Sequence, residues 1–386
     1  MRSKRFLLIL IVLLLILSAI PHPVEATRGL PNTASFGYGA RLDMWGEGVF
    51  QAMELASSMG LDWVAVDVDW NRHWPSLNQA ADFSSLDYVL QAARQKNIHV
   101  LLSLTNPPAW ALTPSGPEPN YTNALLQSIL NVYPDVIQAV ELFPGVNKTT
   151  HWGATPNPQA YLTMLQIVGQ GCDATGRIVY LVTTLEPTLT PSLDADLDDR
   201  TFLESLYTLG GSPYMAIIGI RYLTVMGAPM SDQSELYPMV LRHYEEIRDL
   251  MLNHQHANGM IWITGFHWPT SGTPNPAEPL ALPSTAAHQS QWVNQALQLM
   301  RAQLFIGAAF FSNLNPSIPA QTTPSLLLPT GGIHPASVTI SQFSGGNLTS
   351  TSWSPPSTVP NTQPASAIPL STTSPTYIHF EGKPRK

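Results

Sequence analysis

The chain has 386 residues, a single cysteine and a formal net charge of −8. An acidic balance of this kind lacks the basic surface by which proteins bind nucleic acid, so we exclude a nucleic-acid partner. A lone Cys172 excludes a disulfide framework and a thiolate metal cluster, and we expect it to be a small buried side chain. Charged residues make up 11% of the chain, whereas an average domain has roughly 25%. So low a charged fraction is typical of proteins outside the cell.

The first residues predict export. Three basic residues precede an uninterrupted apolar run over residues 6–20, and Val24-Glu25-Ala26 offers the small residues that signal peptidase requires. Because the run is shorter than the roughly 20 residues of a membrane span, we predict a cleaved signal peptide, residues 1–26, and a secreted, extracellular protein. Cleavage moves the net charge to −10, since Arg2, Lys4, Arg5 and Glu25 are removed. The alternative is that the segment stays uncleaved and anchors the protein; we expect no membrane span in the mature chain.

From residue 35 onward, short apolar strands alternate with amphipathic helices. Strands are predicted at residues 36–40, 63–68, 99–104, 137–143, 178–183, 215–220, 260–264 and 306–311. Helices are predicted at residues 48–59, 86–96, 121–132, 158–169, 200–209, 236–253 and 289–303. Continuous runs of Val, Ile and Leu indicate strands that are buried on both faces. Eight such units in a row favour an α/β fold of the TIM barrel type, (β/α)₈, over the alternative of a shorter open α/β sheet.

The composition changes near residue 345. We predict that residues 33–344 form the barrel and that residues 345–386 form a Ser/Thr/Pro-rich tail. The tail has too few apolar side chains to support a core, so we expect it to be disordered and dispensable for folding. Asn120, Asn147 and Asn347 stand in N-x-Thr sequons, which matter only in a host that glycosylates them.

Several sequence fragments, taken in order, resemble clan A of the glycoside hydrolases, the superfamily of cellulases, mannanases and β-xylosidases. They are GLDWVAVDVDWNRHWP at the second strand, DFSSLDYVLQAARQKNIHVLLSLTNPPAWA around the third, VELFPGVN at the fourth, IWITGFHW at the seventh and GGIHPA near the last helix. The resemblance covers residues 36–340. It implies a (β/α)₈ barrel with its site at the carboxyl ends of the strands.

That superfamily hydrolyses glycosides with two carboxyl groups on either side of the bond, about 5–5.5 Å apart in retaining enzymes. The acid/base glutamate belongs to a fourth-strand motif close to W-E-I-W-N-E-P-N, and here Pro144-Gly145-Val146 replaces Asn-Glu-Pro. The nucleophile belongs to a seventh-strand motif close to W-I-T-E-F-G-W, and here Gly265 replaces the glutamate. Glycine therefore stands at both catalytic positions. By this resemblance, the protein lacks both catalytic glutamates of the superfamily.

Two further features of the superfamily are missing. The second-strand arginine that orients the nucleophile corresponds to Ala65, and a histidine near the end of the sixth strand corresponds to Arg221. We therefore predict a pseudoenzyme, a barrel that keeps the hydrolase outline without its hydrolysis.

Other carboxylates offer an alternative. Glu186 ends the fifth strand at the rim, and Asp67 and Asp69 alternate with apolar residues in the second strand. An active glycosidase with relocated carboxylates would pair Glu186 with Asp69 or Asp67. Glu141 is expected deeper in the barrel, as a buried and paired carboxylate.

The rim residues suit a carbohydrate, because sugar C–H faces pack on aromatic rings while polar side chains bind hydroxyl groups. The candidate ligand-binding residues are Trp70, Asn106, Trp110, Asn147, Trp152, Glu186, Arg221, Tyr222, His267, Trp268 and Asn313. The alternative for each tryptophan is that it packs the loops. His73, His99, His151 and His267 show no metal-ligand spacing, and we expect neither metal nor cofactor.

The favoured hypothesis is a carbohydrate-binding barrel that has lost catalysis and takes an oligosaccharide, a polysaccharide or another surface polymer. The alternatives are the rewired glycosidase and a structural or protein-binding barrel.

Overall fold

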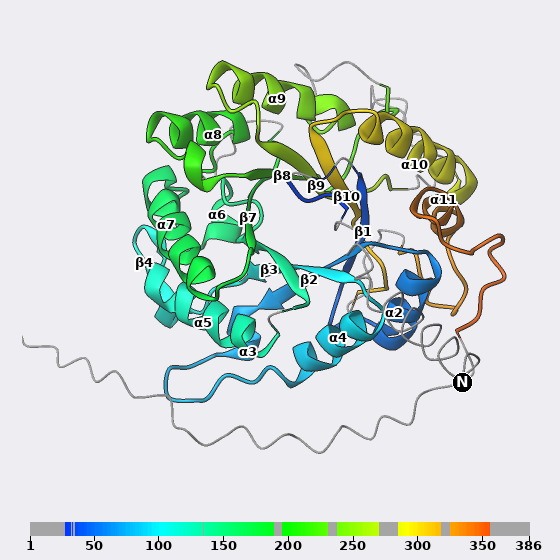
Figure 1. The fold of residues 1–386 in the computed structure, drawn as a ribbon, viewed down its shortest axis with the longest axis horizontal. Helices are drawn as coiled ribbons and strands as arrows, with labels where there is room; N and C mark the ends of the chain where they lie inside the picture. Colours follow the sequence, from blue (N-terminus) through cyan, green and yellow to red (C-terminus); the bar gives the residue numbers. More distant parts are fainter. Residues whose placement is uncertain are drawn as a thin grey trace, which may run out of the picture.

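The computed structural model describes residues 28–355, apart from residues 32, 34, 134, 189–194, 231–237, 270–284 and 318–324. Eight parallel strands close into a barrel in the order β1-β10-β9-β8-β7-β6-β3-β2, and helices surround it as an outer ring (Figure 1). The (β/α)₈ prediction is therefore confirmed, and the open sheet is excluded. In this part of the chain, no helix is long and apolar enough to cross a bilayer. The predicted signal peptide lies outside the described residues.

The barrel strands lie where the apolar runs predicted them, with boundaries shifted by at most two residues. They are β1 (Gly37–Leu42), β2 (Trp63–Asp69), β3 (His99–Thr105), β6 (Ile137–Leu142), β7 (Tyr180–Leu185), β8 (Ile217–Arg221), β9 (Met260–Phe266) and β10 (Ile306–Phe311). A two-residue hairpin, β4 (Leu112–Thr113) with β5 (Gly116–Pro117), follows β3. The fourth barrel strand is thus β6 and the seventh is β9.

The outer helices begin at clear start signals in the sequence. Asn157 and Glu118 cap two of them through their side-chain oxygens, and each is followed by a proline at the first helical position. The helices are α2 (Val49–Ser58), α4 (Ser84–Gln95), α5 (Pro119–Val132), α7 (Pro158–Ala174), α8 (Asp199–Thr208), α9 (Tyr244–Asn253), α10 (Ala286–Arg301) and α11 (Pro335–Ser344). Short helical turns add α3 (Trp70–His73), α6 (Thr149–Trp152), η1 (Ala109–Ala111), η2 (Ser212–Tyr214) and η3 (Leu241–His243).

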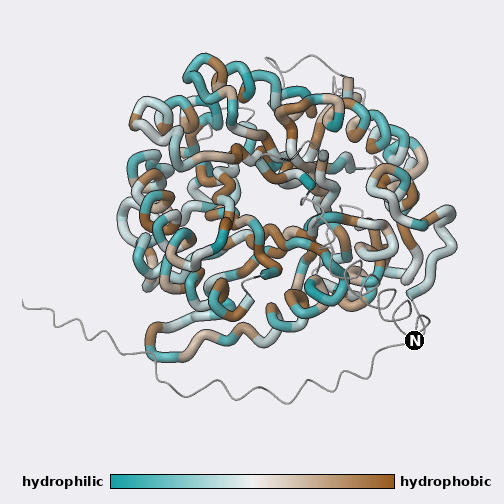
Figure 2. Tube along the Cα trace, in the orientation of Figure 1, coloured by the Kyte–Doolittle hydropathy of each residue, from teal (hydrophilic) through white to brown (hydrophobic). Residues whose placement is uncertain are grey.

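The barrel interior is divided into two halves. In one half, Trp63, Trp262 and Phe310 pack against one another with ring centroids 5.0 to 6.4 Å apart. Two residues further along β2, Ala65 belongs to this same apolar cluster. Figure 2 shows hydrophobic colour along the central strands and hydrophilic colour on the outward turns of the helices. Toward the carboxyl ends of the strands, the residues that point into the barrel become polar. The interior therefore changes from apolar to polar about halfway along the strands.

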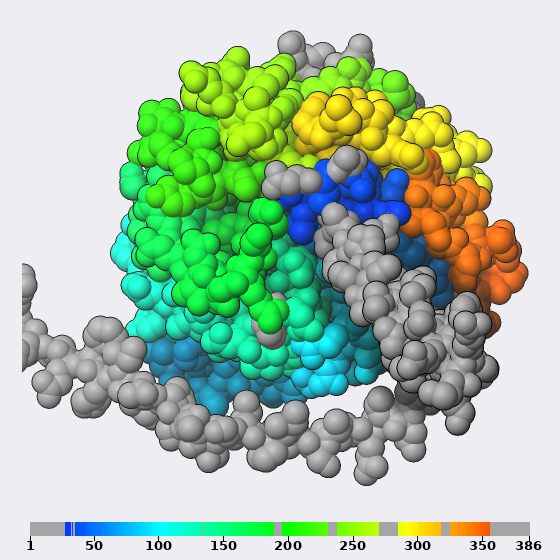
Figure 3. Space-filling view, viewed as in Figure 1, coloured from blue at the N-terminus to red at the C-terminus, as the bar shows by residue number. Residues whose placement is uncertain are grey.

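The start of the described chain closes the amino-end face of the barrel, the face at which the strands begin. The indole N–H groups of Trp63 and Trp262 donate to the carbonyl oxygens of Arg28 and Gly29, each at 2.8 Å. Leu30 joins the apolar cluster beneath them. Figure 3 looks onto this end, where the blue start of the described chain lies near the middle of the face.

The segment predicted as a tail begins with residues that contact the barrel. Leu348 is 8% exposed, and its backbone N–H donates to the Ser341 hydroxyl of α11. Trp353 packs against the core, and its indole N–H donates to the Ser58 hydroxyl at the end of α2. Residues 345–355 therefore pack on the barrel, so the prediction of a disordered tail from residue 345 is wrong for this segment, while residues 356–386 of the predicted tail lie outside the described residues.

Two truncations test where the folded unit ends. A chain ending at Pro355 should unfold at the same denaturant concentration as the full chain. A chain ending at Ser344 loses the burial of Leu348 and Trp353, so its free energy of unfolding should fall by about 2 kcal/mol or more. Urea unfolding followed by tryptophan fluorescence measures both, and equal midpoints for the two truncations would show that the 345–355 segment adds nothing.

The last helix depends on a buried histidine. His334 is 3% exposed, and its Nδ1 accepts a hydrogen bond of 3.2 Å from the backbone N–H of Ala336, at the start of α11. Only an unprotonated Nδ1 can accept, and burial lowers the pKa of His334 to about 4.

This cap predicts a dependence of stability on pH. Between pH 6.5 and about 4 the unfolded chain takes up a proton at residue 334 that the folded chain does not, so stability is lost as the pH falls. At about pH 4, this residue should have lowered the free energy of unfolding by about 3 kcal/mol. His334→Asn keeps a capping oxygen and removes the titration. Urea unfolding at neutral and acidic pH should show a smaller acid loss in the variant, whereas identical losses would contradict this account.

Candidate functional site

A buried arginine organises the polar half of the barrel. Arg41, at the end of β1, is 4% exposed. Its guanidinium donates to the Glu141 carboxylate at 3.2 Å, to the Thr264 carbonyl at 2.9 Å and to the Ser103 hydroxyl at 2.9 Å, and it also bonds Asp67. Glu141, fully buried on β6, accepts further hydrogen bonds from Ser103 and Thr184. The expectation of a buried, paired Glu141 agrees with these contacts.

The second strand carries no arginine at residue 65, where the resemblance led us to expect one. Ala65 lies in the apolar half of the barrel, and Arg41 reaches the polar half from the first strand. The sequence offered one signal for this residue, a charged side chain inside the otherwise uncharged strand GYGARL.

A second arginine shares the Asp67 carboxylate. Arg221, the last residue of β8, lies 3.5 Å from Asp67 through its Nη2 atom. Burial raises the pKa of Asp67, but Arg41 and Arg221 outweigh it and hold the pKa below its usual value. Burial and the neighbouring Arg41 lower the pKa of Arg221, although Asp67, Glu141 and Glu186 oppose that shift. Asp67 is therefore a charged residue bound between two cations.

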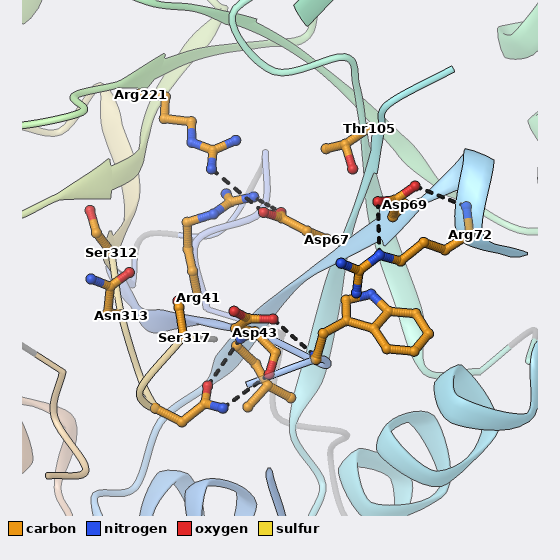
Figure 4. Close-up of a pocket in the computed structure, with 13 residues that line it drawn as sticks. Arg41, Asp43, Asp67, Asp69, Arg72, Thr105, Arg221, Ser312, Asn313 and Ser317 are labelled. Atoms are coloured by element: carbon orange, nitrogen blue, oxygen red, sulfur yellow. Dashed lines mark hydrogen bonds and ion pairs between the residues drawn. The ribbon is translucent and has the colours of Figure 1, made fainter. Parts of the chain in front are cut away.

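A pocket of about 260 Å³ opens at the carboxyl ends of the strands, above this network (Figure 4). Its charged lining balances three arginines against three aspartates, and neutral polar groups and a tryptophan complete it. The lining residues are Arg41, Asp43, Asp67, Asp69, Arg72, Arg221, Thr105, Ser312, Asn313, Asn315, Ser317, Trp45 and Leu42. Balanced charge and dense hydroxyl and amide groups suit a small polar ligand without net charge.

Trp45 supplies the exposed aromatic ring of this pocket, and sequence reasoning missed it. Its side chain is 37% exposed, and the Arg72 guanidinium lies 4.8 Å from its ring centroid. The loop that carries it is fixed by Asn315, which bonds the backbone of Asp43 and of Glu47. Trp45 follows the first strand directly, so its position after a strand end was the available signal.

Two of the predicted ligand-binding residues, Arg221 and Asn313, line the pocket together with Asp67 and Asp69. Asn106 is exposed, and its amide donates to Asp69 at 2.9 Å, just beside the lining. Asp69 also accepts from the backbone N–H of Arg72 and caps α3. Both carboxylates proposed as partners of Glu186 are thus held by neighbouring groups.

The predicted tryptophans lie mostly inside the protein. Trp70, Trp152 and Trp268 are fully buried, and the partly buried Trp110 packs edge-on against Trp70 and Trp74. The indole N–H groups of Trp152 and Trp268 donate to the carbonyl oxygens of Ser115 and Gly227. The rings of Trp70, Trp152 and Trp268 are covered by protein, so these three tryptophans pack the loops and leave no face for a sugar.

Three other candidates also serve the loops. Asn147 is fully buried. Its side chain accepts from the backbone N–H of Glu186 and donates to the Glu186 carbonyl, so it is not accessible for glycosylation at its sequon. The Tyr222 hydroxyl donates to the Leu241 carbonyl. His267 is 5% exposed, and burial lowers its pKa to about 4.

Glu186 lies next to Gly145. Gly145 follows β6, and a Cβ atom added there would lie 3.2 Å from Glu186 Oε2 and 2.9 Å from the His151 ring. His151 Nε2 itself lies 3.3 Å from Glu186 Oε2. A carboxylate therefore lies close to Gly145. It belongs to Glu186, which follows β7, and not to residue 145 itself, which follows β6.

Gly265 has a different neighbour. It lies near the end of β9, and an added Cβ atom would lie 3.2 Å from Arg221 Cγ and 3.6 Å from Arg41 Cδ. The aliphatic part of the Arg221 side chain thus packs against the position at which we expect the missing nucleophile. Both glycines lie on the carboxyl-end side of the barrel, as the alignment predicted.

No group of three or more His, Cys, Asp or Glu side chains in the described ranges has the arrangement of a metal site. Cys172 is buried, and burial raises the pKa of its thiol to about 11, as suits a packed side chain.

Solved glycoside hydrolases share this barrel. A family 39 enzyme from Bacteroides cellulosilyticus WH2 superposes with a TM-score of 0.58 at 13% identity, over 84% of this chain and 65% of its own. A family 39 enzyme from Xanthomonas axonopodis pv. citri gives 0.57 at 13% identity, over 83% and 68%. A family 30, subfamily 8 xylanase from Clostridium acetobutylicum gives 0.50 at 18% identity, over 80% and 71%.

The chain thus has the (β/α)₈ barrel fold of these glycoside hydrolases. It spans just under two thirds of the first of these structures. No protein-family model matches the sequence, and a search of curated proteins finds no match.

The two glycines should respond differently to a side chain. Gly145 has φ +85°, which L-residues avoid, whereas Gly265 has no such conformation. Gly145→Ala should therefore cost about 1–2 kcal/mol of stability. Gly265→Ala should cost less, because the flexible Arg221 side chain can move by a few tenths of an ångström. Urea unfolding of both variants tests this, and a larger loss for Gly265→Ala would contradict it.

Proposed function

We propose that this protein is an exported carbohydrate-binding barrel that no longer hydrolyses glycosides. The observation that carries the proposal is the Arg221 side chain packed over Gly265. A retaining mechanism needs a carboxylate nucleophile there, and a guanidinium cannot replace it. The pocket keeps what recognition of a sugar requires: a partly exposed tryptophan, hydroxyl and amide groups, and carboxylates that accept hydrogen bonds.

The neighbouring folds support carbohydrate as the ligand, since the similar solved structures are glycoside hydrolases. The pocket volume favours one sugar unit at a chain end or branch over a long cleft. Export follows from the apolar segment at residues 6–20 and from the composition, and it remains a proposal from the sequence.

An active glycosidase is the second candidate, because Glu186 lies beside Gly145 and so near the position of the missing acid/base. Its partner would be Asp67 or Asp69. Asp67 is bound by two arginines, and Asp69 caps a helix and accepts from Asn106. A carboxylate that is already so bound makes a weak nucleophile, so we favour binding over catalysis.

Binding and turnover measured together separate the candidates. The purified protein should bind oligosaccharides on a glycan array without cleaving them or aryl glycosides. Trp45→Ala and Arg221→Met should each weaken the binding of the best oligosaccharide about tenfold or more in calorimetry, because each removes a direct contact. Tyr214→Ala, an exposed aromatic residue before β8 at the opposite end of the barrel, is the matched control and should leave affinity unchanged.

Two results would overturn the proposal. Robust turnover that Glu186→Gln abolishes would establish the rewired enzyme. Failure to bind any oligosaccharide would favour a structural or protein-binding role.

A further inference from the structure

The pocket is lined from only part of the barrel rim. Its lining residues come from β8, β1, β2 and β3 and from the loops after β1, β2 and β10. At β9 the rim is closed, because the Arg221 and Arg41 side chains pack against Gly265. β6 and β7, which lie between β3 and β8 in the barrel, supply no lining residue. A ligand that extends out of the pocket on that side meets the residues that follow these two strands.

His151 reaches this side of the rim on a short helix whose surroundings fix it. The next residue of α6, Trp152, is fully buried and donates through its indole N–H to the Ser115 carbonyl at 2.9 Å. Just before the helix, the Asn147 side chain bonds both backbone groups of Glu186. The helix that carries His151 and the backbone of residue 186 are thus held in one arrangement.

The His151 ring takes the space that a side chain at residue 145 would need. A Cβ atom added to Gly145 would lie 2.9 Å from His151 Cδ2 and 3.4 Å from its Cγ. Gly145 also has φ +85°, a conformation that glycine adopts readily and other residues avoid. An imidazole therefore lies where the resemblance leads us to expect the acid/base glutamate.

Glu186 contacts this ring and is closed to a ligand. It is 5% exposed, and its Oε2 atom is buried and accepts no hydrogen bond within the described residues. His151 Nε2 lies 3.3 Å from that oxygen. A buried carboxylate oxygen without a donor is costly, so the pair is most stable with the imidazole proton on Nε2. The other ring nitrogen, Nδ1, is then left to accept a hydrogen bond.

The ring is open to a ligand and belongs to the same charge network as the pocket. The His151 side chain is 33% exposed, and Nδ1 has no hydrogen-bond partner in the ranges that the structure describes. Burial raises the pKa of Asp67, whereas Arg41, Arg221 and, more weakly, His151 lower it. Burial also lowers the pKa of Arg221, and Glu186 is among the carboxylates that oppose this shift. The two pairs, Asp67 with Arg221 and Glu186 with His151, are thus neighbours across the barrel mouth.

We propose that the His151 imidazole binds the second sugar unit of a carbohydrate chain whose first unit fills the pocket, and that Glu186 positions the ring. This inference rests on the proposed function, since it requires a carbohydrate in the pocket. The pocket of about 260 Å³ takes one unit, so the chain continues past β6 and β7, where Nδ1 accepts a hydrogen bond from a sugar hydroxyl. The ligand is therefore an oligosaccharide of at least two units.

Two probes separate the pocket from His151 in calorimetry: the array oligosaccharide that binds most tightly, and the free monosaccharide that ends it. His151→Ala should weaken binding of the oligosaccharide about tenfold or more and leave that of the monosaccharide unchanged. Trp45→Ala should weaken binding of both. His254→Ala is the matched control, because His254 is 27% exposed and lies 2.9 Å from a glutamate, Glu204, before β9 at the opposite end of the barrel.

The role of Glu186 is tested through its coupling to the ring. A glutamine side chain donates as well as accepts, so Glu186→Gln no longer fixes the imidazole proton. This change should weaken binding of the oligosaccharide about threefold or more, and it should have no further effect when His151→Ala is already present. In NMR spectra of the unsubstituted protein with ¹⁵N-labelled histidine, His151 should carry its proton on Nε2. Its Nδ1 resonance should shift with the oligosaccharide and not with the monosaccharide.

Several results would overturn this inference and leave the proposed function intact. They are equal losses for both probes in His151→Ala, full oligosaccharide affinity in that variant, additive effects in the double variant, or a proton on Nδ1. The NMR measurement decides even where His151→Ala does not fold. Failure of every array oligosaccharide to bind would overturn the proposed function, and this inference with it.

Discussion

The Arg41 guanidinium is the interaction on which the polar half of the barrel depends. From β1 it reaches Asp67 on β2, Ser103 on β3, Glu141 on β6 and the Thr264 carbonyl on β9. A buried charge is tolerated only when its partners satisfy it, and the loss of one partner from such a network leaves an uncompensated ion that costs about 3–5 kcal/mol. Asp67 and Glu141 thus share one cation, which adds to the bonds that Glu141 accepts from Ser103 and Thr184 and to the ion pair of Asp67 with Arg221.

This network also decides what the site above it can do. Asp67 faces the pocket but is already shared by Arg41 and Arg221, and its lowered pKa records how firmly its charge is held. A carboxylate in that state accepts hydrogen bonds from a ligand but is poorly suited to deliver a proton or to attack a carbon. The chemistry of the lining thus favours recognition, although it uses residue types that also occur in hydrolytic sites.

The sequence predicts the strands well because two-sided burial demands continuous apolar runs, and each run from 63–68 to 306–311 is such a case. It also places Gly145 and Gly265 correctly at the strand ends, since motif spacing fixes position along the chain. It does not reveal which way a ring turns: Trp70, Trp152 and Trp268 follow strand ends as predicted, yet neighbouring loops cover them. Trp45, one strand earlier, is 37% exposed, on a loop whose backbone is bonded by Asn315.

Gly145 and Gly265 would resist a glutamate side chain in physically different ways. Gly265 has no positive φ, and an added Cβ atom there meets Arg221 Cγ at 3.2 Å, Ser312 Oγ at 3.5 Å and Arg41 Cδ at 3.6 Å, so the obstacle is the neighbouring side chains. At Gly145 the backbone itself has a left-handed conformation, and its N–H donates to the Thr184 carbonyl at 3.0 Å, so the obstacle is the path of the loop. A glutamate placed at residue 145 would start from a strained conformation and point toward His151 and Glu186. A pair of glutamates at these two positions would therefore need a rebuilt loop after β6 as well as two new carboxylates.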